Sequence, residues 1–161
     1  MYSETDIRYV KDSETESTHL LIPRTLNADE RLYGGQLLEW LDETAGIVGK
    51  RHCGRNVVTA AIDNMAFKAG AKLGDMVYIH GYMTSVGRTS MEVRMDSYVE
   101  DPDDGIRHLI NTAYFVMVAI DDEGKPCPVP RLAATNVMEE AEQEAGKKRQ
   151  ELRKVRSKEG F

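Results

Sequence analysis

Residues 27–42 contain the side chains and the spacing that a site for chemistry at a carbonyl carbon needs. Asn27 lies in a polar turn, the pair Gly34-Gly35 follows it, and Asp42 comes seven residues after Gly35. If a helix begins at the glycine pair, its first backbone amides are free to bind a negatively charged oxygen, and no side chain of Gly35 blocks an approaching carbonyl group. A carboxylate at the edge of an apolar helix face, such as Asp42, can act as a general base or a nucleophile. The segment therefore predicts acyl transfer.

Each of these residues also has a purely structural interpretation. Gly34-Gly35 could be only a tight joint between a loop and a helix, and Asp42 could be an ordinary exposed helix aspartate. Asn27 could simply stabilise its turn, because asparagine side chains bond to the backbone of the turn in which they lie. Residue types alone leave both interpretations open for the glycine pair and favour the turn for Asn27.

The helix that would carry Asp42 is indicated by its apolar periodicity. At 100° per residue, one stripe of about 100° collects the apolar residues of the segment from Gln36 to about His52. Asp42 lies just past the edge of this stripe, beside Leu38, which favours partial burial of its carboxylate. The stripe consists of Leu37, Leu38, Leu41, Ala45 and Val48.

The rest of the chain alternates β-forming runs with turns. A short strand is expected within residues 17–24, and residues 26–33 are expected to form a loop. Between residues 91 and 99 apolar and charged side chains alternate, which is the period of a half-buried strand. One apolar helix on one long antiparallel sheet is an α+β architecture. The four long strands are predicted at residues 57–67, 76–86, 91–99 and 107–120.

The two ends differ from this middle part, which we take as a domain over residues 15–130. Residues 1–14 are charged and lack periodicity, which predicts a flexible arm. Residues 131–161 predict an amphipathic helix that Thr135 or Asn136 can cap and whose C-terminal half is basic. The basic half could be a solvated helix face, or it could add positive charge near a bound nucleotide.

Bulk composition excludes several functional classes. The 161 residues suit one domain with one core, and no apolar run approaches the ~18 residues of a membrane helix. The first twenty residues are polar and acidic, so we expect a cytoplasmic protein without a secretory signal. Cys53 and Cys127 have no metal or redox spacing and are expected to be reduced thiols. The net charge of −6 argues against nucleic-acid binding, and we expect no metal and no cofactor.

Three segments together resemble the acyl-CoA thioesterase branch of the hotdog fold, in which a curved antiparallel sheet wraps around one long helix. They are the segment 27–42, the segment from Val57-Val58-Thr59-Ala60 through Phe67 to Gly74-Asp75, and Val86-Gly87-Arg88-Thr89-Ser90-Met91. They occur in the order of the family over roughly residues 15–130. The usual Asn-Pro-x-Gly opening reads Asn27-Ala28-Asp29-Glu30 here, and Ala69-Gly70-Ala71 replaces a segment that often contains proline. Both departures concern loop stiffness more than chemistry.

The resemblance implies a role for each candidate residue. Asp42 is the catalytic carboxylate, the amide of Gly35 polarises the thioester carbonyl, and Asn27 orients the water or the thioester. Gly34 and Thr59 would line the substrate channel, although Thr59 could equally be a core residue of its strand. The cation and two hydroxyls of Arg88-Thr89-Ser90 suit the phosphates or pantetheine of coenzyme A, unless this glycine turn only connects two strands.

Helix geometry predicts that the site is shared between subunits. Gly35 and Asp42 are seven residues apart, which is roughly 10 Å along one helix. Both groups should lie about 3 Å from the reacting atoms. One copy of the helix is therefore not expected to supply both, so Asn27 and Gly35 would come from one subunit and Asp42 from its dimer partner. The resemblance further implies a trimer of dimers, that is, a hexamer.

The expected activity is hydrolysis of acyl-CoA to a free carboxylic acid and coenzyme A. One alternative is a hotdog hydratase that acts on acyl thioesters, but no histidine lies just before the central helix, where that branch places its catalytic histidine. Another alternative is a non-catalytic acyl-CoA sensor, which would favour an appended DNA-binding segment. The basic C-terminal helix is the only candidate for such a segment, and the acidic remainder of the chain argues against it.

Overall fold

The computed structural model describes residues 2–161, so Met1 of the predicted arm lies outside the described residues. Within these described residues, seven strands and two long helices follow each other, with 3-10 turns at Val10–Asp12 and Pro23–Thr25. The elements are β1 (Ile7–Tyr9), β2 (Thr15–Leu20), α1 (Gly34–Cys53), β3 (Asn56–Phe67), β4 (Met76–Val86), β5 (Ser90–Glu100), β6 (Arg107–Ile120), β7 (Arg131–Ala133) and α2 (Val137–Glu159).

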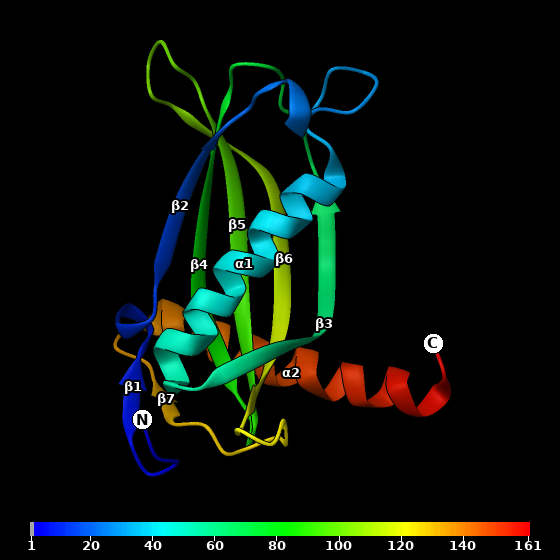
Figure 1. Cartoon of the computed structure of the whole chain (residues 1–161). Coiled ribbons are helices and arrows are strands. Elements are labelled where there is room, and N and C mark those ends of the chain that lie inside the picture. The colour runs from blue at the N-terminus through cyan, green and yellow to red at the C-terminus, as the bar shows by residue number, and fades with distance from the viewer. Residues whose placement is uncertain (1) are drawn as a thin grey trace.

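Five of the strands form one antiparallel sheet in the order β2-β4-β5-β6-β3. Helix α1 packs along one face of this sheet, which we call the inner face, and α2 crosses the opposite, outer face near one end (Figure 1). This arrangement confirms the predicted α+β hotdog fold with a C-terminal helix. Strands β1 and β7 pair separately in parallel, and β3 forms an edge of the main sheet. Within residues 2–161, no helix is both long and apolar enough to cross a membrane.

The hydrophobic core lies between α1 and the inner face. The predicted stripe of α1 is buried except for Leu38, which is partly buried. Helix α1 begins at Gly34, two residues earlier than predicted, because the Leu37 amide already bonds to the Tyr33 carbonyl group. It ends before Gly54, whose φ of 66° suits glycine. Burying such a stripe supplies most of the stability of an amphipathic helix.

Strand β5 differs from the prediction of a half-buried strand, because both of its faces are covered. Its apolar side chains point toward α1, whereas Glu92 and Asp96 point to the outer face and are only 2% and 4% exposed. Arg149 and Arg153 of α2 cover Glu92, whereas Asp96 is bonded to Arg94 and Thr112 of the sheet itself. A period of two distinguishes apolar from polar faces, but it does not say whether the polar face is wet.

The N-terminal segment contains more structure than a loose arm. Strand β1 pairs with β7, and the side chains of Val10 and Ser13 are buried. The pairing of β1 depends on β7, which lies more than 120 residues later in the chain, and the turn at Val10–Asp12 packs against β4. The boundaries of the domain, which we placed at residues 15 and 130, stay a prediction.

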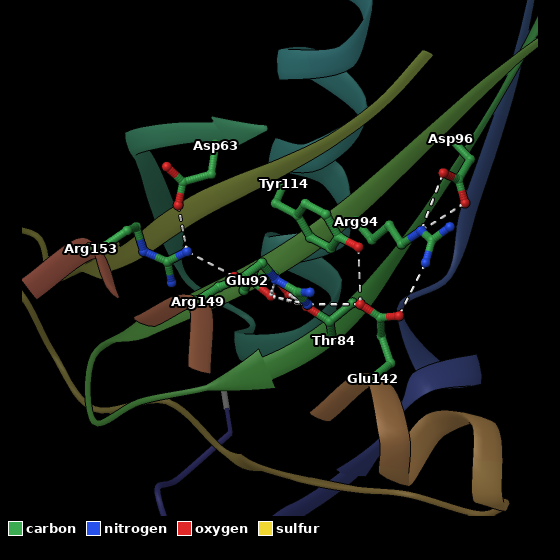
Figure 2. Close-up of polar contacts among 9 residues, drawn as sticks. All are labelled: Asp63, Thr84, Glu92, Arg94, Asp96, Tyr114, Glu142, Arg149 and Arg153. Carbon is green, nitrogen blue, oxygen red and sulfur yellow. Dashed lines mark hydrogen bonds and ion pairs between the residues drawn. The ribbon is translucent and has the colours of Figure 1, made fainter. Parts of the chain in front are cut away.

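Helix α2 forms as predicted, with the Asn136 side chain accepting a hydrogen bond from the Glu139 amide. Its sheet-facing arginines are neither solvated nor free for a nucleotide. They enter a polar network with carboxylates of the outer face, which we call the outer network (Figure 2). Its members are Asp63, Thr84, Glu92, Arg94, Asp96, Tyr114, Glu142, Arg149 and Arg153.

Candidate functional site

The structure brings Asp42 and Thr59 together. Asp42 lies midway along α1 and Thr59 near the start of β3, and the Thr59 hydroxyl donates a hydrogen bond of 2.5 Å to Asp42 Oδ1. Both residues are exposed on this chain, so Thr59 is not a core residue. The hydrogen bond fixes the carboxylate and leaves Oδ2 free to accept a proton.

Gly34 and Gly35 are the first two residues of α1, as an anion-binding helix start requires. The Gln36 and Leu37 amides donate to the Tyr33 carbonyl group at 3.0 and 3.1 Å. The amides of Gly34 and Gly35 make no hydrogen bond within residues 2–161. They are therefore available to a ligand oxygen.

Asn27 stabilises its turn through the oxygen of its side-chain amide. Its Oδ1 accepts hydrogen bonds from the backbone amides of Asp29 and Arg31 at 3.0 and 3.1 Å. This fixes the side chain at the loop that leads into α1. The side-chain amide nitrogen makes no hydrogen bond within the described part of the chain. The turn therefore explains the position of the oxygen but gives no partner to the nitrogen.

Arg88, Thr89 and Ser90 form the tight turn between β4 and β5, which the Gly87 amide closes by bonding to the Ser90 carbonyl group at 2.8 Å. The Arg88 side chain is exposed and makes no ion pair within residues 2–161. Cross-strand pairing relates this turn to Thr59, because Thr59 lies opposite Met117 and Met117 lies opposite Met91. Two strand spacings of about 4.8 Å therefore put Met91, the residue after the turn, roughly 10 Å from Thr59.

Two aromatic residues flank the glycine pair, and sequence reasoning gave neither of them a role. A side chain on Gly35 would lie 2.5 Å from the Tyr33 ring, and one on Gly34 would lie 3.4 Å from the Phe67 ring. Tyr33 and Phe67 are 58% and 59% exposed. Tyr33 could have been identified from its position directly before the glycine pair. Phe67 could not, because it reaches the helix start only through the fold.

The edge strand β3 exposes apolar side chains next to Asp42 and Thr59. Val58, Ile62 and Phe67 are exposed on β3, and Ile47 is exposed on α1. The unpaired edge of such a strand is a template for pairing with another strand. The candidate site therefore lies beside a surface suited to a second chain.

The structure does not bring all predicted residues to one point on this chain. Gly35 and Asp42 lie on the same continuous helix, so their separation of roughly 10 Å stands. Seven residues are nearly two full turns, which places both on the same face of α1. Asp42 and Thr59 are one half of the predicted arrangement, and the glycine pair is the other half.

Residues 30–106 match the model of the thioesterase superfamily. An uncharacterized acyl-CoA thioester hydrolase of Bacillus subtilis (strain 168) is 37% identical over 127 residues, which span 79% of this chain and 74% of that protein. The crystal structure of an apo-hexameric acyl-CoA thioesterase is 36% identical, with a TM-score of 0.91 over 94% of this chain and 97% of that one. An acyl-CoA hydrolase of Staphylococcus aureus, solved with butyryl-CoA and coenzyme A, is 30% identical, with a TM-score of 0.90 over 96% and 94% of the two chains.

Sequence similarity and three-dimensional similarity thus indicate the same family. The chain belongs to the family of hotdog-fold acyl-CoA thioesterases.

Proposed function

We propose that the protein hydrolyses the thioester bond of acyl-CoA to a free carboxylic acid and coenzyme A. The observation that carries this proposal is the Asp42–Thr59 hydrogen bond on an exposed edge of the sheet. The Staphylococcus aureus hydrolase was solved as separate alanine variants of an asparagine, an aspartate and a threonine, which are 15 and 17 residues apart in that chain. Asn27, Asp42 and Thr59 have the same spacing here.

The proposed reaction uses Asp42 as a general base. Asp42 Oδ2 accepts a proton from a water molecule whose oxygen attacks the thioester carbon, while the Thr59 hydroxyl holds Oδ1. The Gly35 amide, with that of Gly34, donates to the oxygen that becomes negatively charged. When the carbon–sulfur bond breaks, the proton returns from Asp42 to the thiolate, so coenzyme A leaves as a thiol.

We infer that each site is shared between two copies of the chain. A second copy that pairs along β3 would cover the exposed apolar residues of this edge. In an isologous dimer, a contact from residue i to residue j is repeated from j to i. Two antiparallel α1 helices that cross near Leu38 would place Gly35 of one opposite Asp42 of the other. Asn27 and Gly35 of one subunit would then meet Asp42 and Thr59 of the second.

A hexamer built as a trimer of dimers is proposed for the whole assembly. Two similar thioesterases, one of them from Yersinia pestis, are described as hexameric. The dimer alone completes the chemistry in our scheme. The further association would place dimers side by side without adding to the reacting groups.

The carrier of the acyl group is proposed to bind at the turn of Arg88, Thr89 and Ser90. The exposed Arg88 guanidinium group suits a diphosphate, and the roughly 10 Å between Met91, next to the turn, and Thr59 leaves room for a flexible thiol arm between phosphate and thioester. Arg88 also has no carboxylate partner within residues 2–161 that would compete with a phosphate.

The test is thiol release from acyl-CoA substrates of increasing chain length, measured with wild type and Asp42→Asn. We expect release with at least one chain length by wild type and a loss of about 10²-fold or more in Asp42→Asn. Tight binding of acyl-CoA without release at any length would reject hydrolysis in favour of a sensor. Release that Asp42→Asn leaves unchanged would reject the role of Asp42.

A further inference from the structure

An open pocket of about 750 Å³ lies between α2 and the outer face of the sheet. Its floor is Ser90, the first residue of β5, and Val116 of β6, and its wall is the C-terminal half of α2. The volume falls in the range of small-molecule sites. The pocket lies on the face of the sheet opposite to Asp42 and Thr59, and the chemistry proposed above does not use it.

The cations of α2 divide into two groups. The arginines that face the sheet are matched by carboxylates: Arg149 donates to Glu92 at 2.9 Å, and Arg153 donates to Glu92 and Asp63 at 2.9 and 2.8 Å (Figure 2). Lys154 and Lys158 line the pocket and make no ion pair within residues 2–161. The outer network thus neutralises the arginines, while two lysines stay available to an anion.

The remaining lining suits an anion that also has an apolar part. Ser90 and Ser157 offer hydroxyl groups, Gln150 offers an amide, and Val116 and Val155 offer apolar surface. No carboxylate lines the pocket, so nothing in its described wall repels a phosphate. A phosphorylated nucleotide combines the negative groups, the hydroxyl groups and the flat base that such a lining can hold.

The pocket adjoins the turn to which we assign the carrier. A side chain on Gly87 would lie 2.7 Å from Ser90 Oγ and 2.9 Å from Gln150 Nε2, so Gln150 of α2 lies directly against the turn. Ser90 belongs to both the turn and the pocket floor. The turn and the pocket are therefore contiguous.

We propose that this pocket binds the phosphorylated nucleotide end of the acyl carrier, with Lys154 and Lys158 bound to its ribose phosphate. The proposal rests on the proposed function, because it takes coenzyme A as the carrier. Binding of the ribose phosphate is thereby assigned to α2, which lies entirely outside residues 30–106 of the thioesterase superfamily match. The partly buried arginines hold the helix, and the unpaired lysines on its flank bind the ligand.

The decisive comparison uses two charge-matched double variants of α2. Lys154→Ala/Lys158→Ala removes the pocket lysines, and Lys147→Ala/Lys148→Ala removes two lysines of the same helix that do not line the pocket. Each variant is assayed with acyl-CoA and with the same acyl group on pantetheine, which lacks every phosphate. We expect only the pocket variant to raise KM for acyl-CoA, by roughly tenfold, because the loss of a charge-assisted hydrogen bond lowers affinity by about that factor. KM for acyl-pantetheine should stay constant.

Three results would overturn the assignment: an unchanged KM for acyl-CoA, an equal rise in the control variant, or an equal rise with acyl-pantetheine. Adenosine 3′,5′-bisphosphate should inhibit wild type competitively with acyl-CoA, whereas non-competitive inhibition would indicate a separate nucleotide site. If wild type hydrolyses neither substrate, the proposed function fails but the pocket can still be tested. Calorimetry with coenzyme A should then show weaker binding in the pocket variant only, and equal binding in all three proteins would reject the pocket.

Discussion

On the central strand β5 both faces of the sheet are buried, but they are built from opposite chemistry. On β5 the inner side chains Met91 and Met95 are fully buried, while the outer side chains Glu92 and Asp96 are almost as buried. The inner face is held by non-directional apolar contact. The outer face is held by ion pairs and hydrogen bonds, whose strength depends on distance and direction.

This difference means that the two helices are positioned by different means. Apolar side chains of the right volume are sufficient to pack α1 against the sheet. The groups of α1 that we propose for function lie at its exposed edge. Glu142 of α2 accepts bonds from Arg94 and Tyr114 of the sheet, and Arg149 of α2 donates to Glu92, so a shift of one residue along the helix would break several bonds together. Burial raises the pKa of Tyr114, which keeps its hydroxyl group protonated and able to donate. We infer that the outer network sets the register of α2.

The largest effect should come from the exposed edge of α1 and should leave stability unchanged. Asp42→Asn keeps the size of the side chain but removes the base, so kcat should fall by about 10²–10⁴-fold. The free energy of unfolding should change by less than about 0.5 kcal/mol, as for other exposed substitutions. Glu43→Gln, an exposed neighbour on the same helix, is the control and should keep wild-type kcat. Equal losses in both variants would contradict a specific role for Asp42.

A change at Glu92 should lower the free energy of unfolding, because this carboxylate holds α2 on the sheet and takes no part in the proposed reaction. Glu92→Gln leaves Arg149 and Arg153 beside a neutral group under α2, which should cost about 3 kcal/mol in urea unfolding. Met95→Leu on the inner face preserves volume and should cost less than about 1.5 kcal/mol. Glu144→Gln breaks only an exposed ion pair with Lys148 and should cost no more than about 0.5 kcal/mol. If Met95→Leu proved more costly than Glu92→Gln, the contrast between the faces would be wrong.

A smaller effect is expected at the turn between β4 and β5. Arg88→Ala should raise KM for acyl-CoA by roughly tenfold and lower kcat less, because the exposed guanidinium group binds the carrier and does not touch the reacting atoms. Steady-state kinetics at several ionic strengths would measure both constants. A KM equal to that of wild type would remove Arg88 from the carrier site.

The smallest effect is a dependence of stability on pH. Burial lowers the pKa of His52 below its ordinary value of 6.5, although its Nε2 is 3.1 Å from the Pro130 carbonyl group. As pH falls through 6.5, the unfolded chain therefore binds a proton that the folded chain does not, and stability is lost. His52→Gln should lose less Tm than wild type between pH 7 and pH 5.5, with the exposed His108→Gln as control. His19 is shifted in the same direction, so part of the slope should persist.

Periodicity in the sequence was sufficient to predict α1, the four long strands and α2, because each has an apolar pattern of its own. The seven-residue spacing of Gly35 and Asp42 likewise required only helix geometry. The partner of Asp42 was harder to identify, since Thr59 could equally have been a core residue. The cross-strand register that aims the Thr59 hydroxyl at Asp42 is set by β6.

The role of α2 could not be predicted, because it depends on contacts between residues about 60 to 90 positions apart. The alternation over residues 91–99 placed Glu92 on the polar side of a half-buried strand, and the basic half of α2 was predicted to be a solvated face or to lie near a nucleotide. Only the packing of α2 across the outer face brings these charges together. The same packing separates Lys154 and Lys158 from the arginines, which no sequence pattern distinguishes.

The sharing of each site between two subunits is tested most directly by mixing inactive Asn27→Ala and Asp42→Ala proteins. Subunit exchange is first demonstrated by mass spectrometry of differently tagged chains. After equal mixing, one site in four combines an intact Asn27 with an intact Asp42 from the partner, so activity should rise to about a quarter of wild type. Activity that stays at the level of the separate variants despite proven exchange would contradict the shared site.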